Sequence, residues 1–136
     1  MGLTVRRSIA VQAVVTEKLK EELKAELEEA AETTQRRIDQ MDFQSRRFLA
    51  DLQRTDLTQA MGARRQIEAE KRRQEAIVQD LRRQIEEAEK LELGSEFSRG
   101  SLEGTVDIEA GDDLFKKLSA SQILIKDGIV VEVREA

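Results

Sequence analysis

Between Thr16 and Leu93 the chain contains one glycine, Gly62, and no proline. Strands and loops of that length need such turn residues, so the stretch predicts long helices. Apolar or small residues recur along its first half at helical spacing. Their opening steps of four, four and three repeat every eleven residues, which predicts nearly straight packing. The stripe is Leu19, Leu23, Leu27, Ala30, Thr34, Ile38, Met41, Ser45, Phe48 and Leu52.

A second stripe matches the first in reverse order. When facing residues of the two stripes are paired, as Phe48 with Ala60, their residue numbers add to 107 or 108, as expected for antiparallel helices. This register predicts an antiparallel helical hairpin arm over residues 16–93, turning near residues 53–57, with Asp56 as a cap for the second helix. The second stripe is Leu57, Ala60, Ile67, Glu70, Gln74, Ile77, Leu81, Ile85 and Ala88. One unbroken helix paired with another chain is the alternative, and Gly62 is another candidate turn.

Both ends of the chain have β character. Residues 3–15 alternate apolar and polar side chains, interrupted by Arg7, and predict an N-terminal strand within residues 1–15. Residues 94–136 carry five glycines, a short helix near 113–119 and an Asp127-Gly128 hairpin turn.

Because the hairpin returns residue 94 to residue 15, the N-terminal strand can join the C-terminal strands. We therefore predict an α+β fold: a two-helix coiled-coil arm with a small antiparallel β-sheet or partly open barrel. The expected core of the β region is Ile9, Val11, Val15, Val106, Ile108, Leu118, Ile125 and Val131.

The composition limits the chemistry. The chain has no histidine and no cysteine, which excludes His-dependent nucleophiles, the usual zinc sites and disulfides. The densest carboxylates, at Asp107, Glu109, Asp112 and Asp113, fit a solvated strand face and a helix cap better than a metal site. We expect no catalytic residue, no cofactor and no metal. No run approaches the ~20 apolar residues of a membrane span, so we expect a cytoplasmic protein without a transmembrane segment.

Charge divides the chain into zones. Residues 36–73, which we call the distal arm, contain ten basic and six acidic residues, whereas residues 17–32 contain three and seven, and residues 94–136 five and nine. A basic tip can contact the phosphates of RNA or of anionic lipid headgroups, although only weakly when acids are interspersed. Solvated helix faces with ion pairs four residues apart are the alternative.

The candidate partner-binding tip combines arginines of the distal arm with apolar side chains that do not fit in the seam, the line of contact between the two helices. Phe48 fits the seam, whereas Phe43 and Leu49 point elsewhere. Either they pack against another hairpin or they contact an unidentified protein partner, and we favour a homo-oligomer formed through the helical arms. The tip residues are Arg46, Arg47, Arg64, Arg65, Phe43 and Leu49.

The C-terminal third has a specific pattern of residues. It reads Leu-Glu-Leu-Gly-Ser-Glu at 91–96, Gly-Ser-Leu-Glu-Gly at 100–104, Gly-Asp at 111–112 and Ile-Lys-Asp-Gly-Ile-Val-Val-Glu-Val at 125–133. This pattern resembles the YlqD family, a group of small bacterial proteins of uncharacterised function, and the layout of that family covers the whole chain. The resemblance implies no activity, cofactor or site residue.

Three functions therefore remain as hypotheses. The first is a non-enzymatic interaction or scaffold protein that acts through a self-associating coiled-coil arm. The second is a prefoldin-like chaperone that holds unfolded chains, although in prefoldin the β-hairpins lie between the two helices. The third is an RNA- or ribosome-associated binding module that uses the basic tip.

Overall fold

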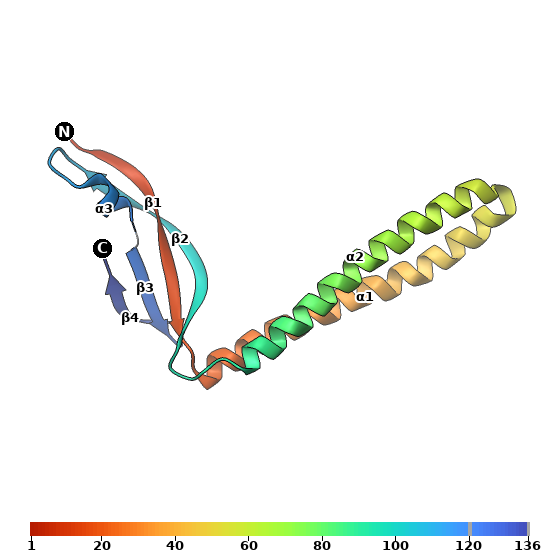
Figure 1. Cartoon of the computed structure of the whole chain (residues 1–136), viewed down its shortest axis with the longest axis horizontal. Coiled ribbons are helices and arrows are strands. Elements are labelled where there is room, and N and C mark those ends of the chain that lie inside the picture. Colours follow the sequence, from red (N-terminus) through yellow and green to blue (C-terminus); the bar gives the residue numbers. More distant parts are fainter. Residues whose placement is uncertain (120, 136) are drawn as a thin grey trace. The chain divides into compact units, whose positions relative to one another are not determined.

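The computed structural model describes residues 1–119 and 121–135. The chain forms two compact units, one made of Met1–Lys20 with Leu91–Ala136 and the other of Glu21–Lys90. The first unit contains the sheet and the second the helical arm (Figure 1). The predicted α+β fold class is confirmed.

The arm consists of α1 (Glu17–Thr55) and α2 (Leu57–Glu89), separated by Asp56 alone. The backbone of Asp56 is extended, and its side chain accepts a hydrogen bond of 3.1 Å from the backbone N–H of Gln59. This cap satisfies one of the free N–H groups at the start of α2. The two helices lie side by side as a hairpin (Figure 1), and Gly62 lies within α2.

The seam of α1 differs from the predicted stripe at one position. Phe48, expected in the seam, is 53% exposed, whereas Leu49 is half-buried. With Leu49 in the stripe, the steps of four, four and three continue from Leu19 to Leu52 without interruption. Eleven residues make almost three full helical turns, so this spacing keeps each side chain on the same line.

The seam of α2 differs in a similar way. Val78 is 3% exposed and buried, whereas Ile77, expected there, is 46% exposed. Ala60 is also buried, and Val78 follows it by eighteen residues, which is five helical turns. Leu57 was assigned to the stripe but is 64% exposed, because it lies in the first turn after the chain reversal.

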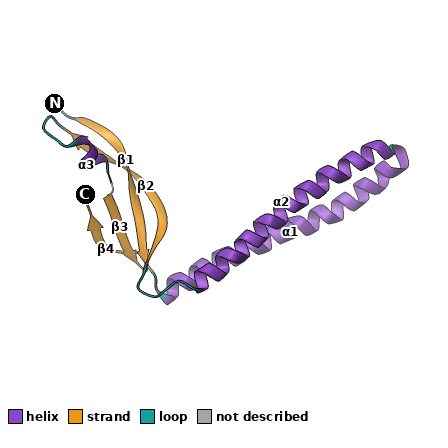
Figure 2. Ribbon diagram, in the orientation of Figure 1, coloured by secondary structure: helices purple, strands orange, loops and turns teal. Residues whose placement is uncertain are grey.

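The sheet has four strands: β1 (Leu3–Val14), β2 (Glu96–Ile108), β3 (Ser121–Lys126) and β4 (Ile129–Arg134). Their order is β2-β1-β3-β4 (Figure 2). The pairs β1–β2 and β3–β4 are antiparallel. Asp127 and Gly128 both have positive φ angles in the turn between β3 and β4, as a two-residue hairpin requires.

The pairing of β1 with β3 is parallel, so the sheet is mixed and not purely antiparallel. The cause is the point at which the chain leaves β2. Ile108 at the end of β2 lies opposite Leu3 at the start of β1, and β3 then begins beside Ile9. The link through α3 (Leu114–Leu118) crosses from that end of β1 to its other side and reaches it midway along the strand. Because the short link brings the chain back from the starting end of β1, β3 continues in the direction of β1 alongside Ile9–Ala13. The sheet keeps two edges and does not close into a barrel.

The two faces of the sheet differ in composition. Cross-strand partners share a face and alternate residues change face, so the register assigns most of the apolar strand residues to one side, which we call the apolar face. It contains Leu3, Val5, Ile9, Val11, Ala13, Phe97, Leu102, Val106, Ile108, Ile123, Ile125, Val130 and Val133. Arg7 and Ser121 lie on this same face. The other side, the polar face, holds Ala10, Val14, Leu124 and Ile129 among polar residues.

Burial in the sheet unit is uneven. Val15 is buried, as predicted, together with Ala13 and Leu124. Leu118 and Val131 were also expected in the core, but they are 37% and 53% exposed. Val131 lies on an edge strand with no further strand beside it, at an irregular step in the β3–β4 pairing. The remaining predicted core residues are half-buried.

Candidate functional site

The register of the arm is reinforced by two ion pairs between its helices. Lys24 Nζ lies 2.8 Å from Glu89 Oε1, and Lys71 Nζ lies 2.9 Å from Asp42 Oδ2. The two pairs are eighteen residues apart on each helix, so they lie on the same side of the hairpin. Hydrogen bonding to Asp42, with the charges of Asp42 and Glu75, raises the pKa of Lys71 against the opposing effects of desolvation and the nearby Arg46.

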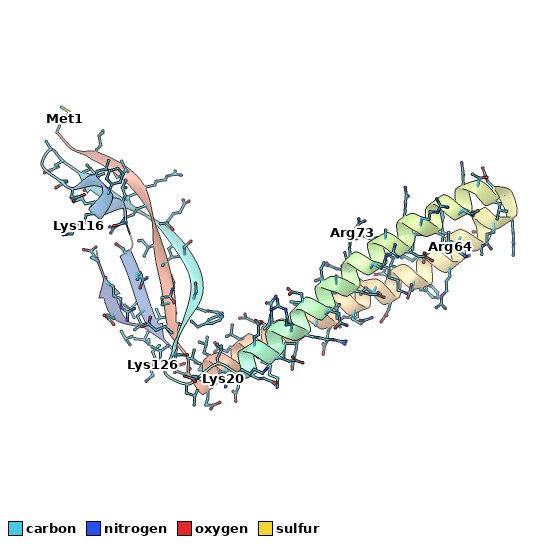
Figure 3. The ribbon with its side chains drawn as sticks, viewed as in Figure 1. Met1, Lys20, Arg64, Arg73, Lys116 and Lys126 are labelled. Carbon is cyan, nitrogen blue, oxygen red and sulfur yellow. The ribbon has the colours of Figure 1, made fainter. Side chains whose placement is uncertain are left out.

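The tip arginines have no such partners. Arg46, Arg47, Arg64 and Arg65 are all exposed, and within the part of the chain that the structure describes none of them makes an ion pair or a side-chain hydrogen bond. Figure 3 shows Arg64 on the arm. Their charges are therefore available to a binding partner.

Other arginines of α2 are paired within their own helix. Arg73 lies 2.5 Å from Glu70, and Arg83 contacts both Asp80 and Glu87. Hydrogen bonds from Arg83 and Gln84 lower the pKa of Asp80 below its ordinary value. The ion-paired helix faces considered as the alternative therefore exist, but they do not include the tip arginines.

The distal arm also exposes large apolar side chains. Phe43 is 80% exposed, Phe48 53%, Leu57 64% and Met61 54%. Leu49, a predicted tip residue, is half-buried and belongs to the seam, as described above. Leu57 and Met61 were missed as candidates; their position just after the turn was the available signal, because helices near a reversal have few neighbours.

One face of α1 is hollowed beside these residues. A groove of about 370 Å³ is lined by Arg37, Gln40, Met41, Gln44, Ser45 and Phe48. Its walls combine apolar groups, amides and one guanidinium, which suits a side chain of another macromolecule. Phe43, Arg46 and Arg47 are spaced three and four residues apart, so they share a neighbouring face of α1.

None of the groups of acidic side chains in residues 1–119 and 121–135 is arranged to hold a metal ion. No helix in these same residues has the length and apolarity to cross a membrane.

Fold and surface together define an α+β protein with a mixed four-stranded sheet and a helical hairpin that exposes arginines and large apolar side chains. Residues 3–134 match the family described as YlqD protein. The chain belongs to the YlqD family.

The chain is similar to a related sequence and to a solved structure. The chain is 35% identical over 127 residues to the uncharacterized protein YlqD of Bacillus subtilis (strain 168), covering 93% of this chain and 94% of that protein. The fold is similar to the crystal structure of a protein of unknown function from Synechococcus sp. WH 8102, with a TM-score of 0.86 and 24% identity, covering 99% of this chain and 96% of that one. At that identity the likeness concerns the fold alone.

Proposed function

We propose that the protein is a non-enzymatic interaction protein whose arm associates with the arm of a second copy. The observation that carries the proposal is the exposure of four large apolar side chains on the distal arm: Phe43, Phe48, Leu57 and Met61 are each more than half exposed. Such side chains on a charged helix pair favour contact with another macromolecule, because covering them removes apolar surface from water.

The distribution of charge favours a second copy as the occupant. The distal arm has a net charge of +4, whereas the rest of the arm is acidic: residues 21–35 have six acidic and one basic residue, and residues 74–90 have five and three. Two arms packed antiparallel would place each distal arm against the acidic part of its partner. A two-fold axis would repeat this favourable contact at both ends.

The test is the mass in solution, measured by sedimentation or light scattering. The wild type should have twice the chain mass of 15.5 kDa, and Phe43→Ser should shift it toward the monomer. Phe115→Ser is the matched control, because Phe115 is also 80% exposed but lies on α3 in the sheet unit. Added salt should weaken the dimer because it screens the opposite charges. A monomeric wild type, or equal effects of the two substitutions, would refute the proposal.

The same exposed side chains also support the chaperone hypothesis. A holdase would suppress the aggregation of an unfolded client protein, and Phe43→Ser should reduce that suppression while leaving the mass of the protein unchanged. Dimerisation without any suppression would favour self-association alone.

A second candidate function, binding of an RNA-containing particle, is favoured by the four unpaired arginines of the tip. Its test is the affinity for a labelled single-stranded RNA as a function of salt. The double variant Arg64→Gln/Arg65→Gln should weaken binding and reduce the salt dependence. Arg82→Gln/Lys90→Gln is the matched control, since it removes the same charge from two positions outside the distal arm that make no ion pair with any described residue. Equal losses would exclude the tip as the binding surface.

A further inference from the structure

A polar cleft interrupts the apolar face of the sheet. Its volume is about 440 Å³, and its walls include Arg7 of β1, Ser121 of β3 and Lys116 of α3. Arg7 takes a position that the alternation of β1 would give to an apolar residue. Its side chain is only 16% exposed. A buried guanidinium on an apolar face is costly unless its donors have acceptors.

Two polar atoms of this cleft are buried without a partner. They are Arg7 Nε and Ser121 Oγ, and each lacks a hydrogen bond among the described residues. Ser121 is 5% exposed. A buried donor that stays unpaired costs about 1–3 kcal/mol, so two in one cleft indicate that something outside the chain completes their hydrogen bonding.

The remaining contacts of Arg7 are incomplete. Nη1 donates to the backbone oxygen of Lys117 at 3.2 Å, while Nη2 reaches Glu135 Oε1 only at 3.4 Å. The Glu135 side chain is 68% exposed, so this carboxylate is a weak and replaceable partner.

The two lysines of α3 differ in their contacts. Lys117 Nζ is occupied, at 2.8 Å from Asp112 Oδ2 and 2.9 Å from the backbone oxygen of Asp107. Lys116 is exposed, and its ammonium makes no ion pair with any other described residue. Asp113, also at the cleft, uses Oδ1 to cap α3 through the backbone N–H of Lys116. Figure 3 shows Lys116 on α3.

We propose that this cleft binds a small oxyanion, a phosphate or carboxylate group. The unused groups are all able to donate: Nε–H of Arg7, the hydroxyl of Ser121 and the ammonium of Lys116. A ligand that completes them must therefore accept several hydrogen bonds, and it must be anionic to replace Glu135 beside the guanidinium. Because Nε of Arg7 and the hydroxyl of Ser121 are themselves buried, binding requires both side chains to turn toward the cleft as the Glu135 contact is released.

The test uses the full chain labelled with ¹⁵N, titrated with sodium phosphate, with sodium succinate, or with sodium chloride at matched ionic strength. The Nε–H resonance of Arg7 should shift saturably with an oxyanion and not with chloride. The phosphate and succinate arms distinguish the two sources of the oxyanion. Ser121→Ala should weaken binding about ten- to hundredfold, the range for one hydrogen bond to a charged group. Glu135→Gln should tighten it, because it removes the competing carboxylate.

Stability without ligand separates a binding role from a structural one. Ser121→Ala should leave the unliganded protein as stable as the wild type or more stable, because it removes an unpaired hydroxyl. Ser8→Ala is the matched control, since Ser8 is an exposed neighbour of Arg7 on the opposite face of β1, and it should bind like the wild type. Two results would overturn the proposal. One is the absence of a saturable shift at phosphate or succinate concentrations that would fill a site with a dissociation constant of about 1 mM. The other is an unchanged affinity in Ser121→Ala.

Discussion

Arg134 and Glu96 come from the two edge strands of the sheet, yet Arg134 Nη2 lies 2.6 Å from Glu96 Oε1, and Nη1 lies 3.0 Å from Oε2. Two strands lie between these edge strands, so in a flat sheet the backbones of the edge strands would be about 14 Å apart. Both side chains belong to the polar face, since Arg134 pairs with Gln122 and Glu96 with Val14. The two-point contact therefore joins the two edge strands across the polar face of the sheet.

This contact predicts a dependence of stability on pH. The hydrogen bond and charge of Arg134 hold the pKa of Glu96 below its ordinary value of 4.5. The folded state therefore binds fewer protons than the unfolded state near that pH. The contribution of Glu96 to stability is present above pH 4.5 and is lost as the pH falls through the lowered folded pKa.

Thermal unfolding between neutral and acid pH checks this dependence. Glu96→Gln should be less stable than the wild type at neutral pH, and the difference should shrink on acidification. Glu103→Gln is the control, because Glu103 lies on the same strand and face and makes no ion pair in the described residues. A difference that stays constant with pH would contradict the assigned role of Glu96.

The seam of α2 predicts losses of unequal size at two adjacent positions. Val78→Ala removes buried methyl groups and should lower the free energy of unfolding by about 1–3 kcal/mol. Ile77→Ala removes more atoms, but from a side chain that is 46% exposed, and should change stability by less than about 1 kcal/mol. Urea unfolding followed by the helical circular dichroism signal measures both. A larger loss of stability for Ile77→Ala than for Val78→Ala would show that Ile77, and not Val78, lies in the seam.

Gly62 offers a stabilising substitution. It lies within α2 with nothing within 4 Å of an added Cβ, so Gly62→Ala should stabilise the arm by about 0.5–1 kcal/mol. Gly100→Ala is the contrasting variant: Gly100 has φ of +100° beside an irregular step in the β1–β2 pairing, and alanine there should destabilise the sheet. Destabilisation of the helices by Gly62→Ala would indicate that residue 62 is not helical.

The cap at the hairpin turn predicts a loss of stability when the side chain of Asp56 is removed. Asp56→Ala leaves the backbone N–H of Gln59 without its acceptor and should cost about 1 kcal/mol of stability. Asp56→Ser keeps an oxygen that can accept the same bond and should recover most of the loss. Thermal melting of the three proteins measures the difference, and equal losses in both variants would argue against capping.

Much of the fold could be predicted from local patterns. The absence of proline and the eleven-residue spacing specify long helices, and the reversed order of the two stripes specifies their antiparallel pairing, because a helical period and a register are properties of the chain itself. The Asp127-Gly128 turn is equally local, since only a few residues tolerate positive φ. The tip arginines were likewise visible as a run of charge.

Tertiary structure decided what depends on distant neighbours. Leu49 continues the spacing of the α1 stripe, so its place in the seam was within reach of the sequence. Whether Val78 or Ile77 enters the seam turns on about 100° of helix rotation, which the partner helix fixes. The parallel pairing of β1 with β3 follows from where the link after β2 ends, and the burial of Arg7 depends on contacts with Lys117 and Glu135, which lie far away in the sequence. Spacing along the chain carries no record of which strand lies beside which, so these features arise only when segments far apart in sequence meet.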